Sequence, residues 1–212
     1  DKSAEGAPIY LVGEEGNIVV PTFNFGFCRG QLYDINQTPS EGMGIFSEFV
    51  RELNNSMRSK HPIQSISVVG RHARSICSID TYTAFEKKSS FAKLIELNAT
   101  VLLIGASFQS VSLVHFAEEQ NLVPYRYHKE FRGAYRDYDG QLTEKSYGMF
   151  VRNLDINPIE QRIRWGKHIY SVTEFFDFPS EGQFHMEVSA TDMEDNRRVL
   201  RVPINIEKLR GL

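Results

Sequence analysis

Cysteine is scarce in this sequence, which holds only Cys28 and Cys77. Two cysteines cannot build the disulfide framework of a small secreted domain, so we expect a reducing, cytoplasmic environment. Long apolar runs are missing too, since none reaches the about 18 residues that a membrane-spanning helix needs. The first residues also lack the pattern of a signal peptide. We therefore expect no membrane partner.

An excess of positive charge is lacking as well. Lys and Arg total 24 against 27 for Asp and Glu, which gives a formal net charge of −3. Proteins that bind nucleic acids are generally more basic than this, so we expect no nucleic-acid partner. The 212 residues, of which 41% are hydrophobic and 24% charged, are typical of a globular protein. We assign residues 1–212 to a single domain.

The first half of the chain alternates between short apolar runs and amphipathic segments. The apolar runs predict buried strands at residues 17–23, 65–70 and 100–105. Uniform apolarity is typical of parallel strands that are covered on both faces. The amphipathic segments predict helices at residues 45–53, at 91–97 with Ser89 or Ser90 as the cap, and from Ser110 to about Gln120. The pattern predicts an α/β fold with a central, mostly parallel sheet flanked by helices.

The second half is richer in strand-like sequence. Apolar and polar residues alternate over 123–128, and Asp139-Gly140 predicts a hairpin turn before a strand at 147–152. The run from Asn157 to Glu160 has the signature of a helix start, so we expect a short helix that ends at Gly166. Further strands are predicted at 184–190 and 202–206. The fold thus gains an added antiparallel hairpin.

His115 and Glu118 form the most suggestive local group for chemistry. Their spacing places both on one face of the predicted helix, just after the predicted strand at 100–105. A histidine there can act as a general base near neutral pH, and a carboxylate can orient it. A solvated helix surface has the same spacing, and spacing alone favours that interpretation. No further ligand has a matching spacing, so we expect no metal.

Two polar loops could hold a phosphate group. Arg58-Ser59-Lys60-His61-Pro62 supplies basic and hydroxyl groups before a predicted strand, although an ordinary surface loop has a similar composition. Residues 38–44, Thr-Pro-Ser-Glu-Gly-Met-Gly, precede a predicted helix, and glycines let a ligand approach backbone amides. Neither loop matches a Walker or a dinucleotide-binding motif.

Taken in order, these segments resemble the aminoglycoside 3-N-acetyltransferase family, also called the antibiotic N-acetyltransferases. Residues 12–23 are similar to the family's glycine-rich turn, apolar strand and Pro-Thr-Phe/Tyr, and the likeness continues through Tyr33-Asp34 and 38–51. The run from Arg58 to Ser65 is similar to Arg-Ser-x-His-Pro-x-x-Ser. Residues 111–118, Val-Ser-Leu-Val-His-Phe-Ala-Glu, are similar to Asn-Thr-x-Leu-His-x-Ala-Glu. The resemblance covers about residues 12 to 153.

The resemblance implies an N-acetyltransferase that uses acetyl-CoA as co-substrate and an amine, often on an amino sugar, as acceptor. It implies His115 as the catalytic base, with Glu118 to orient it and Ser112 as a candidate donor to the oxyanion. Contacts with the coenzyme are expected from Thr38, Ser40, Gly44, Arg58, Ser59, His61 and Ser65.

Two departures from the family pattern bear on activity. Val111 stands where the family commonly has Asn, which removes or moves one polar contact near the site. The family's upstream strand–helix segment is not found, so we expect an N-terminally truncated acetyltransferase-like domain. A non-catalytic binding or scaffold protein that retains the fold is the alternative. An α/β-hydrolase is disfavoured because the nucleophile elbow is missing.

Aromatic and acidic residues gather over residues 125–152. Aromatic faces and carboxylates suit an amino sugar, and the acceptor site is expected to draw on Asp34, Tyr125, Asp137 and Asp139. An ordinary half-buried hairpin would have a similar composition. The same stretch also holds four cations, Arg126, Lys129, Arg132 and Arg136. They favour an anionic acceptor, such as a nucleotide-linked amino sugar of biosynthesis, over the polycationic aminoglycoside of an antibiotic-resistance enzyme. The oligomeric state stays open.

Overall fold

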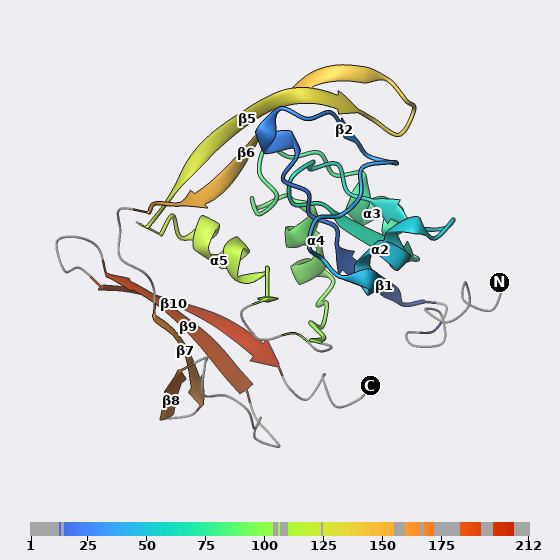
Figure 1. Ribbon diagram of the computed structural model, residues 1–212. Coiled ribbons are helices and arrows are strands. Elements are labelled where there is room, and N and C mark those ends of the chain that lie inside the picture. Colours follow the sequence, from blue (N-terminus) through green and yellow to red (C-terminus); the bar gives the residue numbers. More distant parts are fainter. Residues whose placement is uncertain are drawn as a thin grey trace. The chain divides into compact units, whose positions relative to one another are not determined.

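The structure is a computed structural model of the chain, shown with its elements labelled in Figure 1. It describes residues 13, 15–103, 106, 110–123 and 125–154, and the backbone of strands at 160–165, 168–171, 183–191 and 197–205. The chain forms two compact units. The first comprises Asp1–Leu97 with Lys129–Met149, and the second comprises Asn98–His128 with Phe150–Leu212. Among the helices of these described residues, none combines the length and apolarity needed to cross a bilayer.

The first unit contains a three-stranded antiparallel sheet in the order β1-β4-β3. Strand β1 (Asn17–Pro21) pairs with the central strand β4 (Ile66–Gly70), which also pairs with β3 (Met57–Arg58). The apolar runs at 17–23 and 65–70 therefore do contain strands. The predicted parallel direction of this sheet is wrong.

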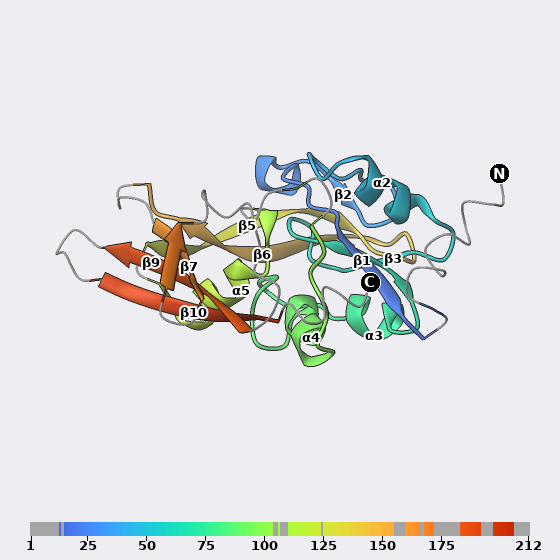
Figure 2. The same cartoon turned by 90° about the horizontal axis from the view of Figure 1, so that it is seen from below.

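Helices on both faces of the sheet explain why an antiparallel strand has a uniformly apolar sequence. Helix α2 (Ile45–Glu52) lies on one face, and α3 (Ala73–Cys77) and α4 (Ser90–Glu96) lie on the other (Figure 2). Strand β4 is buried at every position from Ile66 to Val69. Burial on two faces produces such a run whatever the direction of the neighbours. The predicted layering of helices around a sheet is confirmed.

Two of the predicted helices form where expected. The predicted cap of α4 is confirmed, because the Ser89 hydroxyl accepts the N–H of Ala92 at 3.2 Å. Helix α2 packs on the sheet through Val50, which is fully buried against Val20 and Val69. Its first residue, Ile45, is 91% exposed, so only part of the apolar stripe of this helix faces the core.

A long hairpin contributes residues 129–149 to the first unit. Strands β5 (Arg126–Arg136) and β6 (Leu142–Arg152) are neighbours in a second sheet, in which β2 (Tyr33–Asp34) pairs in parallel with β5. The turn predicted at Asp139-Gly140 is confirmed. Gly140 has a φ of 80°, and its N–H donates to the carbonyl of Asp137 at 3.0 Å. Buried residues pack the hairpin on its unit: Phe27, Tyr33, Ile35, Ile63, Tyr135 and Tyr147.

The second unit contains helix α5 (Val114–Gln120) and a four-stranded antiparallel sheet in the order β10-β9-β7-β8. Its strands are β7 (Glu160–Trp165), β8 (His168–Ser171), β9 (Gln183–Thr191) and β10 (Arg197–Asn205). Strands β9 and β10 confirm the two strands that alternation predicts near the end of the sequence.

Three predictions in the second unit are wrong. Residues 100–103 form no strand, and Ile104 and Gly105 lie outside the described residues. Helix α5 begins at Val114, well after Ser110, and its cap position is Leu113. Residues 160–165 are a strand because they pair with the adjacent strand β8 and with the more distant strand β9, and this pairing overrides the local helix signal. The other residues of that expected helix start, 157–159, and Gly166 lie outside the described part of the chain.

Candidate active site

His115 on α5 is hydrogen-bonded to a buried carboxylate. Its Nδ1 lies 2.6 Å from Oε2 of Glu118, as the spacing of three on a helix predicts. The Glu118 side chain is 3% exposed, whereas that of His115 is 35% exposed. The carboxylate is therefore buried while part of the imidazole ring reaches solvent. Two side chains on a fully solvated helix face would both be exposed.

Two residues from the start of the following strand complete the surroundings of Glu118. The Tyr125 hydroxyl donates to Oε1 of Glu118 at 3.0 Å, and Nε of Arg126 lies 2.9 Å from Oε2. The chain reaches these positions because Leu122, with a φ of 46°, turns it back immediately after α5. From the sequence, Arg126 counts only among the four cations that favour an anionic acceptor. Only residues 121–125 separate the end of α5 from the start of β5. This short connection is the signal that could have placed Arg126 beside Glu118.

Glu118 is ionised despite its burial. Burial by itself raises the pKa of a carboxyl, but the hydrogen bond from His115, the charge of Arg126 and the hydrogen bond from Tyr125 outweigh it and lower the pKa of Glu118. An ionised carboxylate only accepts hydrogen bonds, so the hydrogen in the 2.6 Å contact belongs to Nδ1 of His115. In the neutral imidazole the basic lone pair is then on Nε2.

A second and longer contact joins the next carboxylate of α5 to the same strand. Nε2 of His128 lies 3.4 Å from Oε1 of the buried Glu119. The His128 ring packs on Phe150, with ring centroids 4.8 Å apart. Two adjacent carboxylates of α5, Glu118 and Glu119, thus contact two basic residues of β5, Arg126 and His128. These contacts fix the helix on the strand.

Ser112 lies just before α5 and is half-buried. Its carbonyl accepts the N–H of His115 at 3.0 Å, and the N–H groups of Val114 and Phe116 donate to other carbonyls of the same turn. The amides of residues 114–116 are therefore already bonded within the chain. The hydroxyl of Ser112 is one group that this turn can offer to a ligand.

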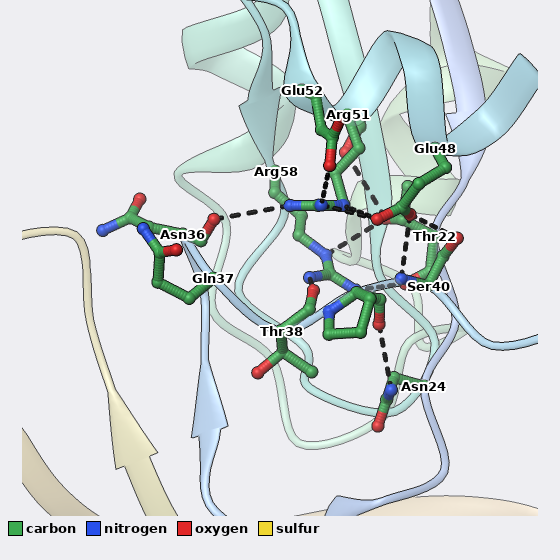
Figure 3. Close-up of polar contacts among 12 residues, drawn as sticks. Thr22, Asn24, Asn36, Gln37, Thr38, Ser40, Glu48, Arg51, Glu52 and Arg58 are labelled. Atoms are coloured by element: carbon green, nitrogen blue, oxygen red, sulfur yellow. Dashed lines mark hydrogen bonds and ion pairs between the residues drawn. The ribbon is translucent and has the colours of Figure 1, made fainter.

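Arg58 is buried in the first unit and holds separate segments together (Figure 3). Its Nε donates to the hydroxyls of Thr22 and Ser65 at 3.2 and 2.9 Å. Its terminal nitrogens donate to the carbonyls of Thr38 and Thr22. The guanidinium also lies 5.1 Å from the centroid of the Tyr33 ring. Arg58 therefore fixes the start of the loop at 38–44 from inside the protein.

Ser59 and Ser65 are buried beside Arg58. The Ser59 hydroxyl accepts the N–H of Ile66 at 2.9 Å, and the Ser65 hydroxyl donates to the carbonyl of Thr22 at 2.7 Å. Both hydroxyls are thus engaged in holding β4 and the end of β1.

His61 is also buried, with 4% of its surface exposed. Its Nδ1 accepts the N–H of Gln64 at 3.1 Å, which places the ring hydrogen on Nε2, 3.2 Å from the carbonyl of Gly148. Burial lowers the pKa of His61 to about 4, so the ring is neutral at pH 7. His61 links its loop to the hairpin.

The loop at 38–44 presents its outer side to solvent while its inner side is tied to α2. The N–H and hydroxyl of Ser40 donate to Oε2 of Glu48 at 3.0 and 2.7 Å. The hydrogen bond from Arg51, with those from Ser40, lowers the pKa of Glu48 to about 2 against the opposing effect of burial. Gly44 has a φ of 84°, a conformation that glycine adopts without strain, and it is exposed. Among the coenzyme candidates, Gly44 is exposed and Thr38 and Ser40 are half-buried, whereas the other four are buried.

The four acceptor candidates divide between the two units. Tyr125 belongs to the Glu118 group of the second unit. Asp34, Asp137 and Asp139 belong to the first. Asp34 lies 3.6 Å from Nε of Arg136, and Asp137 lies 3.0 Å from Nζ of Lys60. Asp139 is exposed in the hairpin turn, where it accepts the N–H of Gln141.

A polar pocket of about 490 Å³ lies in the first unit, beside Arg51 and Arg58. Arg51 is balanced there by the carboxylates of Glu48 and Glu52 (Figure 3). Within the residues that the structure describes, no group of three or more His, Cys, Asp or Glu side chains is placed to hold a metal ion.

A histidine that is hydrogen-bonded to a buried carboxylate, on a helix of a mixed α/β chain, defines a candidate acid–base catalyst. The chain belongs to the aminoglycoside 3-N-acetyltransferase family, whose family model matches residues 7–175. The resemblance drawn from the sequence motifs is thereby confirmed.

Two curated relatives share the family name. The SPbeta prophage-derived aminoglycoside N(3')-acetyltransferase-like protein YokD of Bacillus subtilis (strain 168) is 29% identical over 182 residues, which cover 78% of this chain and 66% of YokD. The aminoglycoside N(3)-acetyltransferase III of Acinetobacter baumannii is 26% identical over 122 residues, which cover 56% of this chain and 43% of that protein. The chain thus spans slightly less than two thirds of the first relative and under half of the second.

Solved structures of the family have the same fold. The crystal structure of YokD has a TM-score of 0.58 and 26% identity, covering 66% of this chain and 63% of that one. The structure titled AAC-IIIb binary with CoASH has a TM-score of 0.59 and 20% identity, covering 66% of this chain and 59% of that one.

Proposed function

We propose that this chain is an acetyl-CoA-dependent N-acetyltransferase that acetylates an amine of an amino sugar. The observation that carries the proposal is the His115–Glu118 pair, with its ring exposed and its carboxylate buried. Membership of a family named for acetyl transfer to an aminoglycoside nitrogen supports the reaction class. A carboxylate that holds the imidazole in one orientation and stabilises the imidazolium suits general-base catalysis.

In this proposal, His115 supplies the proton transfer. An amine cannot attack a thioester while its lone pair holds a proton. Nε2 of His115 accepts a proton from the amine as the nitrogen attacks the acetyl carbonyl carbon. The C–S bond then breaks, the amide forms, and the imidazolium returns the proton to the leaving thiolate of coenzyme A. Glu118 holds the ring in place and stabilises the imidazolium through Nδ1.

Attack on the thioester builds negative charge on the carbonyl oxygen, and a donor placed beforehand lowers that barrier. We assign this role to the hydroxyl of Ser112, because the neighbouring amides already donate within their own turn. Tyr125 is assigned to the same centre through its bond to Glu118.

We place the coenzyme at the exposed loop that contains Thr38, Ser40 and Gly44. Arg58, Ser59, His61 and Ser65 are then positioning residues, since all four are buried and bonded to the chain itself. Arg58 shapes the loop directly through the carbonyl of Thr38. Asp34, Asp137 and Asp139 are assigned to the acceptor.

Two classes of acceptor are supported by different observations. The four cations at 126–136 favour an anionic amino sugar, although Arg126, Arg132 and Arg136 each already lie beside a carboxylate of the chain. The names of both relatives favour an aminoglycoside. Release of free thiol from acetyl-CoA, measured with a nucleotide-linked amino sugar, a simple monoamino sugar and an aminoglycoside, tests the proposal and ranks the acceptors. Thiol release with a matching acetylated product mass is expected for at least one of them. If none of these amines increases the consumption of acetyl-CoA, a non-catalytic binding or scaffold protein is the better interpretation.

A further inference from the structure

Lys145 on β6 is enclosed by a cage that the chain itself provides. Its Nζ lies 2.9 Å from Oδ2 of Asp80 and 3.8 Å from Oδ2 of Asp137. The same nitrogen lies 4.4 Å from the ring centroid of Tyr135 and 6.0 Å from that of Tyr147. Carboxylates combined with aromatic faces are how proteins bind an ammonium ion. The cage is open to solvent, since the side chains of Lys145, Asp80 and Asp137 are 26%, 38% and 23% exposed.

The walls of this cage do not depend on Lys145. Oδ1 of Asp80 accepts the Tyr147 hydroxyl at 2.8 Å. Asp137 is held by Nζ of Lys60 at 3.0 Å, and the Tyr135 hydroxyl donates to the carbonyl of Lys60 at 2.9 Å. Each wall therefore keeps at least one partner if the Lys145 ammonium is removed.

The charges of the cage balance only while Lys145 is present. Asp80 and Asp137 supply two negative charges, and Lys60 and Lys145 supply two positive ones. Without Lys145 the partly buried cage would carry a net charge of −1, which attracts a cation more strongly than it would in open water.

We propose that Lys145 is a specificity-determining residue, whose ammonium fills a site that would otherwise bind a second ammonium of the acceptor. The wild-type chain then selects acceptors with few positive charges. The inference rests on the proposed function, in which Asp137 contributes to the acceptor site.

Binding of a small ammonium probe tests the site without any need for activity. Ethylammonium, titrated into the full chain and followed by NMR, should bind saturably to Lys145→Met and at least about tenfold more weakly to the wild type. Lys145→Gln is the second variant in case the first does not fold, and Lys145→Arg should behave as the wild type. Adding Asp80→Asn to Lys145→Met should abolish the binding.

Lys93→Met is the matched control, because Nζ of Lys93 also pairs with a carboxylate, that of Glu96 on α4, but takes no part in the Asp80–Asp137 cage. It should not create a binding site. Equal binding of the probe to the wild type and to the folded Lys145 variant, or no binding to either, overturns the inference.

Acetylation kinetics test the specificity role. The ratio of kcat/KM for a diamino acceptor to that for a monoamino acceptor should rise about tenfold in Lys145→Met and stay constant in Lys93→Met. An unchanged ratio in Lys145→Met overturns that role. If no variant acetylates any amine, the proposed function fails, while the probe titration still decides whether Lys145 fills a cation site.

Discussion

Glu118 carries a negative charge although its side chain is almost completely buried. A buried carboxylate is stable only when donors replace the water it has lost. Here Nδ1 of His115 and the Tyr125 hydroxyl donate to the carboxylate, and the Arg126 guanidinium supplies the opposite charge, with Nε 2.9 Å from Oε2. The 2.6 Å contact with Glu118 puts the hydrogen on Nδ1, although Nη2 of Arg126 also lies 3.3 Å from that nitrogen. Nε2 is then the basic nitrogen. Glu118 therefore determines both the position and the chemical form of the candidate base.

Replacing His115 should slow acetyl transfer without weakening coenzyme binding. We expect His115→Gln to lower kcat about 10²–10⁴-fold, because proton transfer in the transition state contributes that much. Coenzyme binding measured by calorimetry should persist. Glu118→Gln should lower kcat less, since a glutamine still offers one acceptor oxygen to Nδ1.

The matched control for that prediction is His128→Gln. His128 also faces a buried carboxylate of α5, but it contacts Glu119 at 3.4 Å and not Glu118. Its replacement should leave kcat within about twofold of the wild type. Near-normal turnover in His115→Gln, or an equal loss in His128→Gln, would contradict the assignment of the base.

Single residues show which part of the site the sequence can reveal. The pair of His115 and Glu118 was predictable because helical spacing is a local property. Arg126 was not, because its place depends on the turn at Leu122. Arg58 has the residue type of a phosphate ligand, yet it is buried and bonded to carbonyls. Sequence does not separate a ligand-binding arginine from one that braces the fold, since burial is set by distant residues.

At the scale of elements, hydrogen bonds hold the loop at 38–44 against helix α2. Glu48 on the first turns of α2 receives two hydrogen bonds from Ser40, and Arg51 holds the same carboxylate in position. Loss of a bond to a charged group costs about 1.5–3 kcal/mol. The helix therefore fixes the side of the loop that faces away from solvent.

Removing the hydrogen bonds between Ser40 and Glu48 should weaken binding of the coenzyme more than binding of the acceptor. We expect Ser40→Ala and Glu48→Gln to raise the KM for acetyl-CoA by about 3- to 10-fold, with a smaller change in the KM for the amine. Glu52→Gln is the control, because Glu52 contacts Arg51, whereas Ser40 donates to Glu48. Steady-state kinetics with each substrate varied in turn gives both constants. A larger effect on the amine than on acetyl-CoA would place the loop in the acceptor site instead.

Element types were more predictable than strand directions. The apolar runs at β1 and β4 and the alternation at β9 and β10 identify strands correctly, because both patterns follow from burial of one or two faces. Direction depends on which strands pair, and that is decided by contacts far apart in sequence. The strand at 160–165 was missed for the same reason: its partners lie up to about thirty residues away.

At the scale of the whole molecule, stability should depend on a histidine outside the proposed chemistry. Burial lowers the pKa of His61 to about 4, while a histidine in the unfolded chain titrates near 6.5. Between these pH values the unfolded chain binds a proton that the folded chain does not. The free energy of unfolding therefore falls as the pH drops below about 6.5, by about 3 kcal/mol in total once pH 4 is reached.

Urea unfolding at pH 7.5 and at pH 5 measures this effect. His61→Gln should lose stability at pH 7.5 but show a smaller difference between the two pH values than the wild type, by about 2 kcal/mol. His72→Gln, which replaces a histidine that is not fully buried, should keep the wild-type difference. The same pH dependence in His61→Gln and in the wild type would show that another group is responsible.

The residues around Glu118 are close together in sequence as well as in space. Positions 115, 118, 125 and 126 lie within one short stretch, whereas Arg58 meets partners 36, 20 and 80 residues away. Closing the longest of these loops costs about 2 kcal/mol more entropy than closing a loop of seven residues. When the chain is partly unfolded, the contacts that shape the loop at 38–44, where we place the coenzyme, should therefore open before the geometry of the candidate base is lost.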